Sequence, residues 1–357
     1  MESRKVQRVG YSTLSVSLPR SWVKEVGIKQ GDLVVFQPEK GGSLKLTPSA
    51  LAEHREEVKE FVINADLCSE PGMLERTIVG NYILGRDLFS IRSEERIRSE
   101  HTKEIRGIMA RLIGLGIVEE TPDRVILQCS IDPRKFHLDM LLRRLSIISL
   151  TIVKETIQAL VDFDDSLAKD AINREDEADM MYLLALRLLI SAQRRREVAE
   201  EIGLTDPLHI LYFGLMLRYL ELIADYAEET AHRVIELLQK YKDKLPQWVI
   251  ERMSNLSDLA HDLVLKSVDC FFIGDIKIAN SLLEMQKFIA LKRDRLMQDL
   301  PEMPHLRLIL WNITRIADNG KGIALIAINN ALERKTNICT KTGQQASNRR
   351  RKIKNGF

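Results

Sequence analysis

Apolar and polar residues alternate in the first 48 positions of the chain, and most of the remainder has a helical period instead. Near the start, apolar residues stand among polar ones at near-alternate spacing: Val6, Val9, Leu14, Val16 and Leu18. That is the period of a half-buried strand. The later runs LVVF and SLKL have the same strand character. The pattern therefore predicts four short strands over residues 1–48.

Glycine, proline and serine residues mark the turns between these strands. Gly10 begins the first turn, and Pro19 ends the second strand. Ser21 is predicted to cap a short helix, Trp22 to Val26, which Gly27 ends in a left-handed conformation. The stretch Glu39 to Gly42 reads as a hairpin turn. So small a unit buries little apolar surface by itself, so we expect it to need a partner, most simply a second copy.

Residues 49–131 alternate strand and helix patterns in the order βαβαββ, which predicts a small α/β module with one sheet. No glycine-rich loop leads from a strand into a helix, so no phosphate loop is predicted here. The charged helix EERIRSEHTKEIRGIMARLIG interleaves bases and acids, as solvated helix faces do. The segment therefore predicts a fold class and no chemistry.

From Asp132 onward, apolar residues recur at spacings of three and four. The pattern is divided by three proline-containing breaks: GLTDPLH, KDKLPQW and LPEMPH. Six helices are expected, at 133–163, 164–196, 207–241, 246–272, 275–299 and 305–335. Two sets of three predict two antiparallel three-helix bundles, over residues 132–242 and 243–336. Residues 337–357 form a basic tail that we expect to be disordered.

Composition narrows the function classes. The 357 residues carry a net charge of only +2, so any nucleic-acid contact must come from a local basic patch. The four cysteines are far apart and lack metal-ligand spacing, which suits a reducing compartment. No apolar secretory segment or stretch of about 20 apolar residues stands out, so we expect a cytoplasmic protein without membrane insertion. No nucleophile motif indicates an enzyme.

Three short motifs give the first 48 residues a family resemblance. Leu18-Pro19-Arg20, Val26-Gly27-Ile28 and Gly31-Asp32 follow one another with the order and spacing of the AbrB/MazE/SpoVT swapped-hairpin DNA-binding domain, which this segment resembles. The resemblance implies a homodimer that interleaves its hairpins and binds operator DNA.

Eight Lys and Arg against four acids give residues 1–48 a net charge of +4. Basic side chains neutralise phosphates and read guanine. The DNA contacts are therefore expected from Arg4, Lys5, Arg8, Arg20 and Lys24. A dimerisation module with ordinary solvated charge is the alternative.

The helical half repeats itself. RYLELIADYAEETA (218–231) aligns with WNITRIADNGKGIA (311–324), and Asp164 and Asp275 each open an Asp-x-x-x-Ala motif. With the acidic stretch REDEADMMYLLALRLL, residues 133–335 resemble the PhoU family of phosphate-uptake regulators. That resemblance implies two tandem three-helix bundles, each with a Glu/Asp-x-x-x-Asp motif that holds metal.

Two acidic pairs fit that motif in the first bundle. Glu175 and Asp179 lie four residues apart, as do Glu221 and Asp225, so each pair shares one helix face. If the two helices pack antiparallel, the four carboxylates converge. Oxygen ligands select magnesium, calcium, manganese or iron, so a divalent or iron-type metal is predicted here. His232 could add a nitrogen ligand, and the alternative is a solvated acidic face.

The second bundle departs from the motif. By the repeat alignment, the four acidic positions of the first bundle fall on Gln286, Ala290, Thr314 and Asp318. One carboxylate is too little to hold a divalent ion, so metal is expected only in the first bundle.

The sequence thus predicts a multidomain chain: an N-terminal β swapped-hairpin domain, a small α/β module and an all-α pair of PhoU-like three-helix bundles. Its expected function is a DNA-binding transcriptional regulator of phosphate uptake and homeostasis. The helical half would sense phosphate status through a metal or through a phosphate transport or signalling protein. The alternatives are a cytoplasmic adaptor that restrains a phosphate transporter or sensor kinase without binding DNA, and a metal-dependent enzyme on a helical bundle.

Overall fold

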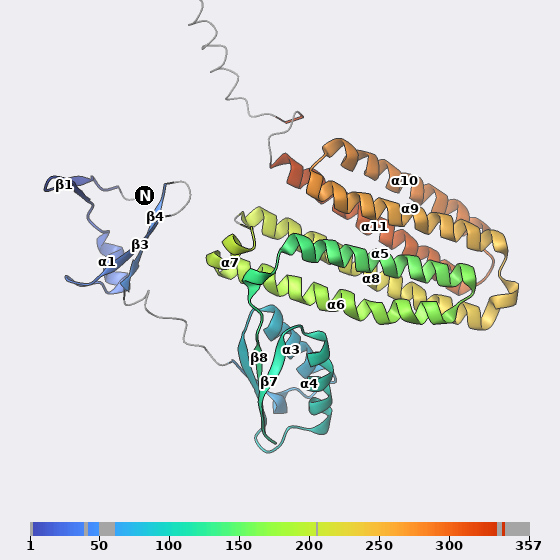
Figure 1. Ribbon diagram of the computed structural model, residues 1–357, viewed down its shortest axis with the longest axis horizontal. Coiled ribbons are helices and arrows are strands. Elements are labelled where there is room, and N and C mark those ends of the chain that lie inside the picture. The colour runs from blue at the N-terminus through green and yellow to red at the C-terminus, as the bar shows by residue number, and fades with distance from the viewer. Residues whose placement is uncertain (1–2, 39–41, 50–60, 205, 334–337, 340–357) are drawn as a thin grey trace, which may run out of the picture. The chain divides into compact units, whose positions relative to one another are not determined.

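The computed structural model describes residues 3–38, 42–49, 61–204, 206–333 and 338–339. The chain divides into two units, residues 1–60 and residues 61–357 (Figure 1). A strand-rich N-terminal unit followed by a largely helical second unit confirms the predicted fold class. The finer domain boundaries stay a prediction.

The N-terminal unit consists of two antiparallel two-stranded ribbons and one helix. Strand β1 (Gln7–Val9) pairs with β2 (Thr13–Ser15), and β3 (Val34–Pro38) pairs with β4 (Leu44–Pro48). Helix α1 (Arg20–Val26) follows the first ribbon. All four predicted strands are therefore present.

The turns around α1 follow the sequence with one exception. Gly10 has a φ of 71° and Gly27 a φ of 73°, the left-handed backbone that glycine adopts without strain. Pro19, not Ser21, occupies the position before the helix, and no side chain caps it. The predicted serine cap is wrong because the helix already begins at Arg20, which leaves Ser21 inside the first turn. The hairpin turn predicted at residues 39–42 lies largely outside the described residues.

The N-terminal unit has almost no core in a single chain. Of its described residues, only Pro48 is buried. Its exposed large apolar side chains are Val6, Val9, Tyr11, Leu14, Val16, Leu33, Val35, Phe36 and Leu44. An isolated two-stranded ribbon is marginally stable in water at best. This apolar surface therefore needs to be covered for the unit to be stable.

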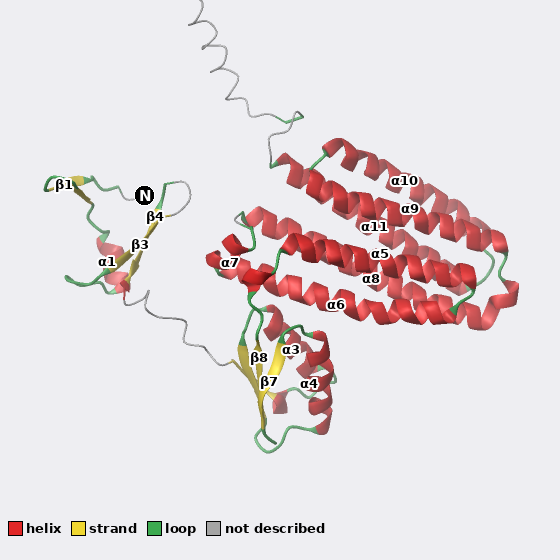
Figure 2. Cartoon of the chain, viewed as in Figure 1, coloured by secondary structure: helices red, strands yellow, loops and turns green. Residues whose placement is uncertain are grey.

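The second unit begins with the predicted βαβαββ module. Its elements are β5 (Phe61–Asn64), α3 (Met73–Ile83), β6 (Leu88–Arg92), α4 (Ser99–Arg111), β7 (Leu115–Glu120) and β8 (Arg124–Cys129). The sheet order is β5-β6-β8-β7, with β5 parallel to β6 and the other pairs antiparallel. Figure 2 shows α3 and α4 beside one another on one side of the sheet. Fully buried Tyr82, Phe89 and Leu127 form the core of this sandwich.

Two three-helix bundles follow, as predicted. Their helices are α5 (Leu138–Asp162), α6 (Asp165–Arg194), α7 (Arg196–Glu201), α8 (Pro207–Tyr241), α9 (Gln247–Ile273), α10 (Ile276–Asp299) and α11 (Pro304–Leu332). Short 3₁₀ turns are η1 (Ala65–Leu67), η2 (Pro133–Lys135) and η3 (Lys242–Lys244). The first bundle is α5, α6 and α8, and the second is α9, α10 and α11. Because α5 and α8 also pack on α9 and α11, the bundles share one apolar core.

The internal repeat is visible in the helix starts. Asp164 accepts hydrogen bonds from the backbone of Ser166 and Leu167 at the start of α6. Asp275 caps α10 in the same way. Asp206 likewise caps α8 ahead of Pro207.

In the part of the chain that the structure describes, one helix is long and apolar enough to cross a membrane by length and composition alone, Pro207–Lys244. The helix still contains no run of about 20 apolar residues, because Arg218, Glu221 and Asp225 interrupt it. Leu217, Ile223 and Val234 on this helix are fully buried in the bundle core. A core helix of a soluble protein passes the same test, so the finding is weak evidence for a membrane span.

The α/β module is fastened to α6. The guanidinium of Arg187, which is 1 % exposed, donates to the carbonyl of Tyr82 and pairs with Asp87. Arg194 donates to the carbonyl of Leu84 at 2.8 Å. The module is thus held along one helix of the first bundle.

Candidate functional site

The predicted acidic residues of the first bundle meet between α6 and α8. Single carboxylate oxygens of Glu175, Asp179 and Asp225 all lie within 4.8 Å of one another. Glu175 and Asp179 share one face of α6, and Asp225 faces them from the neighbouring helix. These three residues are called the acidic group below.

Glu221 lies outside the acidic group. It is buried, and Arg218, three residues earlier on α8, pairs with its carboxylate. His232 is half exposed and stands 3.5 Å from Glu228, so it also lies outside the group. The structure therefore brings together three of the four predicted ligands.

Burial and mutual repulsion disfavour ionised carboxylates at this site. Burial, followed by the charge of the neighbouring Asp179, raises the pKa of Glu175 to about 8. Burial followed by the charge of Asp225 raises the pKa of Glu221 to about 7, against the pull of Arg218. Burial and Asp179 raise the pKa of Asp225 to about 6. A cation bound here would relieve this repulsion.

An arginine from the α/β module reaches the acidic group. Arg111, the last residue of α4, forms a close ion pair with Asp179. Sequence reasoning missed this residue because the two partners are 68 positions apart and lie in different modules. No local spacing connects them, and the arginines of α4 were interpreted as a solvated face.

The corresponding place in the second bundle is nearly neutral. The side-chain amide of Gln286 donates to Asp318 at 2.8 Å, between α10 and α11. The hydroxyl of Thr314 donates to the carbonyl of Leu310 at 2.9 Å, and Arg315 lies 3.6 Å from Asp318. Its polar groups are thus satisfied without an added ion.

The donor set of the acidic group fits a hard divalent cation. Carboxylate oxygens are the ligands that magnesium, calcium and manganese prefer, and water can complete the coordination. Among the described residues, this is the one group of three or more ligand side chains close enough to hold an ion.

The basic residues predicted to contact DNA are exposed. Arg20 and Lys24 lie four positions apart on α1 and therefore share one face of that helix. Arg4 and Lys5 precede β1. Arg8 is engaged in its own hairpin, since its Nε donates to the carbonyl of Tyr11 at 3.2 Å. Part of the function of Arg8 is therefore to hold the turn.

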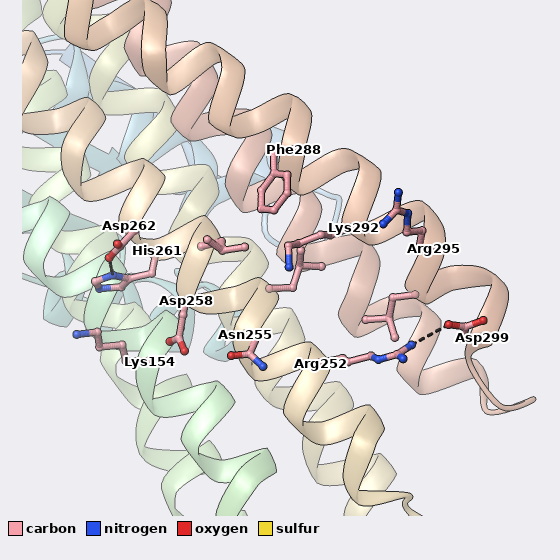
Figure 3. Close-up of a pocket in the computed structure, with 13 residues that line it drawn as sticks. Lys154, Arg252, Asn255, Asp258, His261, Asp262, Phe288, Lys292, Arg295 and Asp299 are labelled. Carbon is pink, nitrogen blue, oxygen red and sulfur yellow. Dashed lines mark hydrogen bonds and ion pairs between the residues drawn. The ribbon is translucent and has the colours of Figure 1, made fainter.

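A groove of about 880 Å³ runs beside α9 and α10 (Figure 3). Phe288, Lys292 and Arg295 line it from α10, and Lys154 lines it from α5. An ion pair of 2.7 Å joins Arg252 to Asp299 across it. None of the site residues predicted from the sequence lines this groove.

Comparison with known proteins identifies two regions of the chain. A model of the PhoU domain matches residues 142–234, and a model described as "Antidote-toxin recognition MazE, bacterial antitoxin" matches residues 7–52. One region of the chain is thus similar to MazE antitoxins and another to the PhoU domain. PhoU from Pseudomonas aeruginosa is similar in structure, with 19 % identity over 55 % of this chain and 96 % of that one and a TM-score of 0.47. No curated protein matches the chain.

The extent of each match bears on the candidate sites. The PhoU domain includes all four predicted metal ligands, whereas the second bundle lies beyond its end. The MazE-type domain includes Arg8, Arg20 and Lys24, and it begins after Arg4 and Lys5. Both resemblances stated from sequence motifs are confirmed. MazE-type and PhoU proteins are regulatory families.

Proposed function

We propose that this protein is a cytoplasmic, homodimeric, DNA-binding transcriptional regulator of phosphate uptake and homeostasis. The observation that carries the proposal is the presence of a MazE-type domain and a PhoU domain in one chain. The first domain suggests DNA-binding regulation, and the second suggests phosphate homeostasis. The helical half senses phosphate status through a bound metal or a phosphate transport or signalling protein.

The dimer forms through the N-terminal unit. Nine large apolar side chains of that unit are exposed in the single chain, and a second copy presents the same set. Two interleaved copies would give these side chains a shared core, which neither ribbon has alone. Such a core also explains how so small a unit can present rigid basic side chains to a ligand.

The DNA-binding face uses basic residues of both copies. Residues 1–48 carry a net charge of +4, so two copies contribute +8. Arg20 and Lys24 project from one face of α1, Arg4 and Lys5 precede β1, and Arg8 lies in β1. Each phosphate that they neutralise contributes about −0.9 to the slope of log affinity against log salt.

Binding of the full chain to DNA tests this function. Genome-wide mapping of bound sites should find enriched operators, and one of these then serves as the probe in a salt titration. Changing Arg20 and Lys24 together to Ala removes four basic side chains from the dimer, so it should weaken binding more than tenfold and reduce the salt slope by about 3.6. Lys45→Ala, on β4, removes a charge from the same unit as a control. We avoid Arg8 here because its loss would also loosen the turn.

The alternative function is an adaptor that dimerises through the same unit and restrains a phosphate transporter or sensor kinase. The extensive apolar surface of the N-terminal unit accounts for dimerisation without DNA. An absence of enriched DNA sites, with the dimer intact in sedimentation, would replace the proposed regulator by this adaptor.

The helical half binds a divalent or iron-type metal through Glu175, Asp179 and Asp225, with Glu221 next to them. The support is the convergence of carboxylates, with burial and then the charge of Asp179 raising the pKa values of Glu175 and Asp225. Metal analysis of the purified protein, with manganese titration of the full chain, tests this assignment. Absence of any bound ion would make the group a partly buried acidic patch without a cofactor.

A further inference from the structure

Arg111 enters the acidic group from another module of the fold. Its guanidinium forms a close ion pair with Asp179 and lies 3.8 Å from Asp176 and 3.9 Å from Glu75. The side chain is 37 % exposed. Its Nε is buried and makes no hydrogen bond to any described residue. The arginine is therefore held by charge at the edge of the acidic group.

Other cations nearby have different partners. Arg218 is committed to Glu221, and Arg174 forms two hydrogen bonds with Glu155 on α5. Within the described part of the chain, Arg111 is the one cation that forms an ion pair with a member of the acidic group. Its charge thus stands where a metal ion would otherwise balance the carboxylates.

We propose that Arg111 is an internal cation that competes with metal for Asp179, and that metal binding loosens the contact between α4 and α6. This inference rests on the proposed metal site. An ion and a guanidinium bound to one small carboxylate group repel each other, so each weakens the binding of the other. Because such coupling is reciprocal, a tighter α4 contact lowers metal affinity by the same factor.

The α/β module remains attached when Arg111 is released. Arg187, on the same helix as Asp179 and eight residues later, holds the module through Tyr82 and Asp87. This anchor is buried and involves no member of the acidic group. Metal binding would therefore change the position or mobility of the end of α4 while the other end of the contact stays fixed. The module becomes a reporter of metal occupancy.

Calorimetric titration of the full chain with manganese tests the competition. Arg111→Met should bind manganese at least tenfold more tightly than the unchanged protein, a factor within the usual range of coupling between sites. Arg111→Lys keeps a charge but loses the planar guanidinium, so its affinity should be intermediate. Arg106→Met is the matched control, because Arg106 is also on α4 but pairs with the exposed Glu120. It should leave the affinity unchanged.

Hydrogen exchange provides a second readout. Saturating manganese should speed exchange in residues 99–115 of the unchanged protein and not in Arg111→Met, where the contact is already lost. Thermal unfolding and circular dichroism establish that each variant is folded, and Arg111→Lys replaces Arg111→Met if the latter is not.

The possible outcomes separate this inference from the metal site. Tighter manganese binding by Arg111→Met, or manganese binding by that variant alone, supports both the metal site and the competition. Equal binding by all variants overturns the competition and keeps the metal site. Tighter binding without any change in exchange overturns the link to α4. Binding by none of the variants overturns the metal site and the inference with it.

Discussion

The two three-helix bundles have the same architecture, but corresponding positions are acidic in the first bundle and nearly neutral in the second. An aspartate caps the second helix of each, Asp164 in one and Asp275 in the other. Between the second and third helices, the first bundle places three carboxylates. The second places a glutamine that donates to a single aspartate, Gln286 to Asp318. The scaffold therefore does not need the acidic group in order to pack.

The difference shows what the acidic group costs the fold. Desolvated carboxylates close together are unfavourable unless a cation compensates them. The raised pKa values of Glu175 and Asp225 reflect this cost in the first bundle. The hydrogen-bonded amide in the second bundle avoids it. The proposed metal would offset this cost, which arises in only one of the two matching bundles.

The largest expected effect is a loss of manganese affinity when the first bundle is made as neutral as the second. The double change Glu175→Gln and Asp225→Asn keeps the ion pair between Asp179 and Arg111 while it removes two of the three close carboxylates. We expect manganese affinity to fall at least a hundredfold in calorimetry, because one carboxylate is left for the ion. Asp170→Asn, an exposed acid on the same helix, is the control. Retained affinity would place the metal elsewhere.

Adding a carboxylate to the second bundle should have the next largest effect. Gln286→Glu nearly preserves the shape but replaces a donated hydrogen bond of 2.8 Å by two facing carboxylates. A lost buried hydrogen bond and the added repulsion together should cost about 2–3 kcal/mol at pH 7, measured by urea unfolding. The loss should shrink at pH 5, where one carboxyl becomes protonated. The exposed Gln298→Glu, on the same helix, serves as the control.

If Gln286→Glu were as stable as the unchanged protein at pH 7, the proposed difference between the two bundles would be contradicted. It would mean that both bundles tolerate facing carboxylates equally well, and that the raised pKa values of the first bundle report no special cost.

Rising pH should destabilise the metal-free first bundle. Glu175 has a folded-state pKa of about 8, above the ordinary value of 4.5. The unfolded chain therefore releases this proton first, and stability is full below about pH 4.5 and falls as pH rises to about 8. Glu175→Gln should raise the melting temperature at pH 8 by several degrees relative to the unchanged protein, and by little at pH 5. Calorimetry at both pH values measures the difference.

Saturating manganese should remove most of that difference at pH 8, because a bound ion stabilises the ionised carboxylates. A melting temperature that responds equally to Glu175→Gln at both pH values would assign the effect to packing and not to charge.

Local patterns were enough to predict most of the fold. Strand alternation located all four strands of the N-terminal unit, and the spacing of three and four located the long helices. The acidic pairs were found because residues four apart share a helix face. Errors arose where two local preferences competed. Serine is a good helix cap, but Pro19 already occupies the capping position and the helix begins at Arg20. Ser21 therefore lies inside α1.

Contacts between modules were beyond such patterns. Nothing near Arg111 in the chain marks it as the partner of Asp179, because its role depends on how the α/β module packs on α6. The short helix α7 was likewise missed, since six residues give too little periodicity to stand out. The number of close carboxylates also depends on helix rotation, which leaves Glu221 with Arg218 instead of the acidic group.

The smallest expected effect concerns the remaining acid of the second bundle. In Asp318→Asn, the new amide oxygen still accepts the hydrogen bond from Gln286, and only the partly exposed ion pair with Arg315 is lost. Such pairs contribute about 0–1 kcal/mol, so unfolding should change by no more than that. Manganese affinity should stay within twofold of the unchanged protein, because the acidic group lies between α6 and α8 and is untouched. A large loss of affinity would show that Asp318 holds an ion of its own, and the second bundle would then no longer be the neutral member of the comparison.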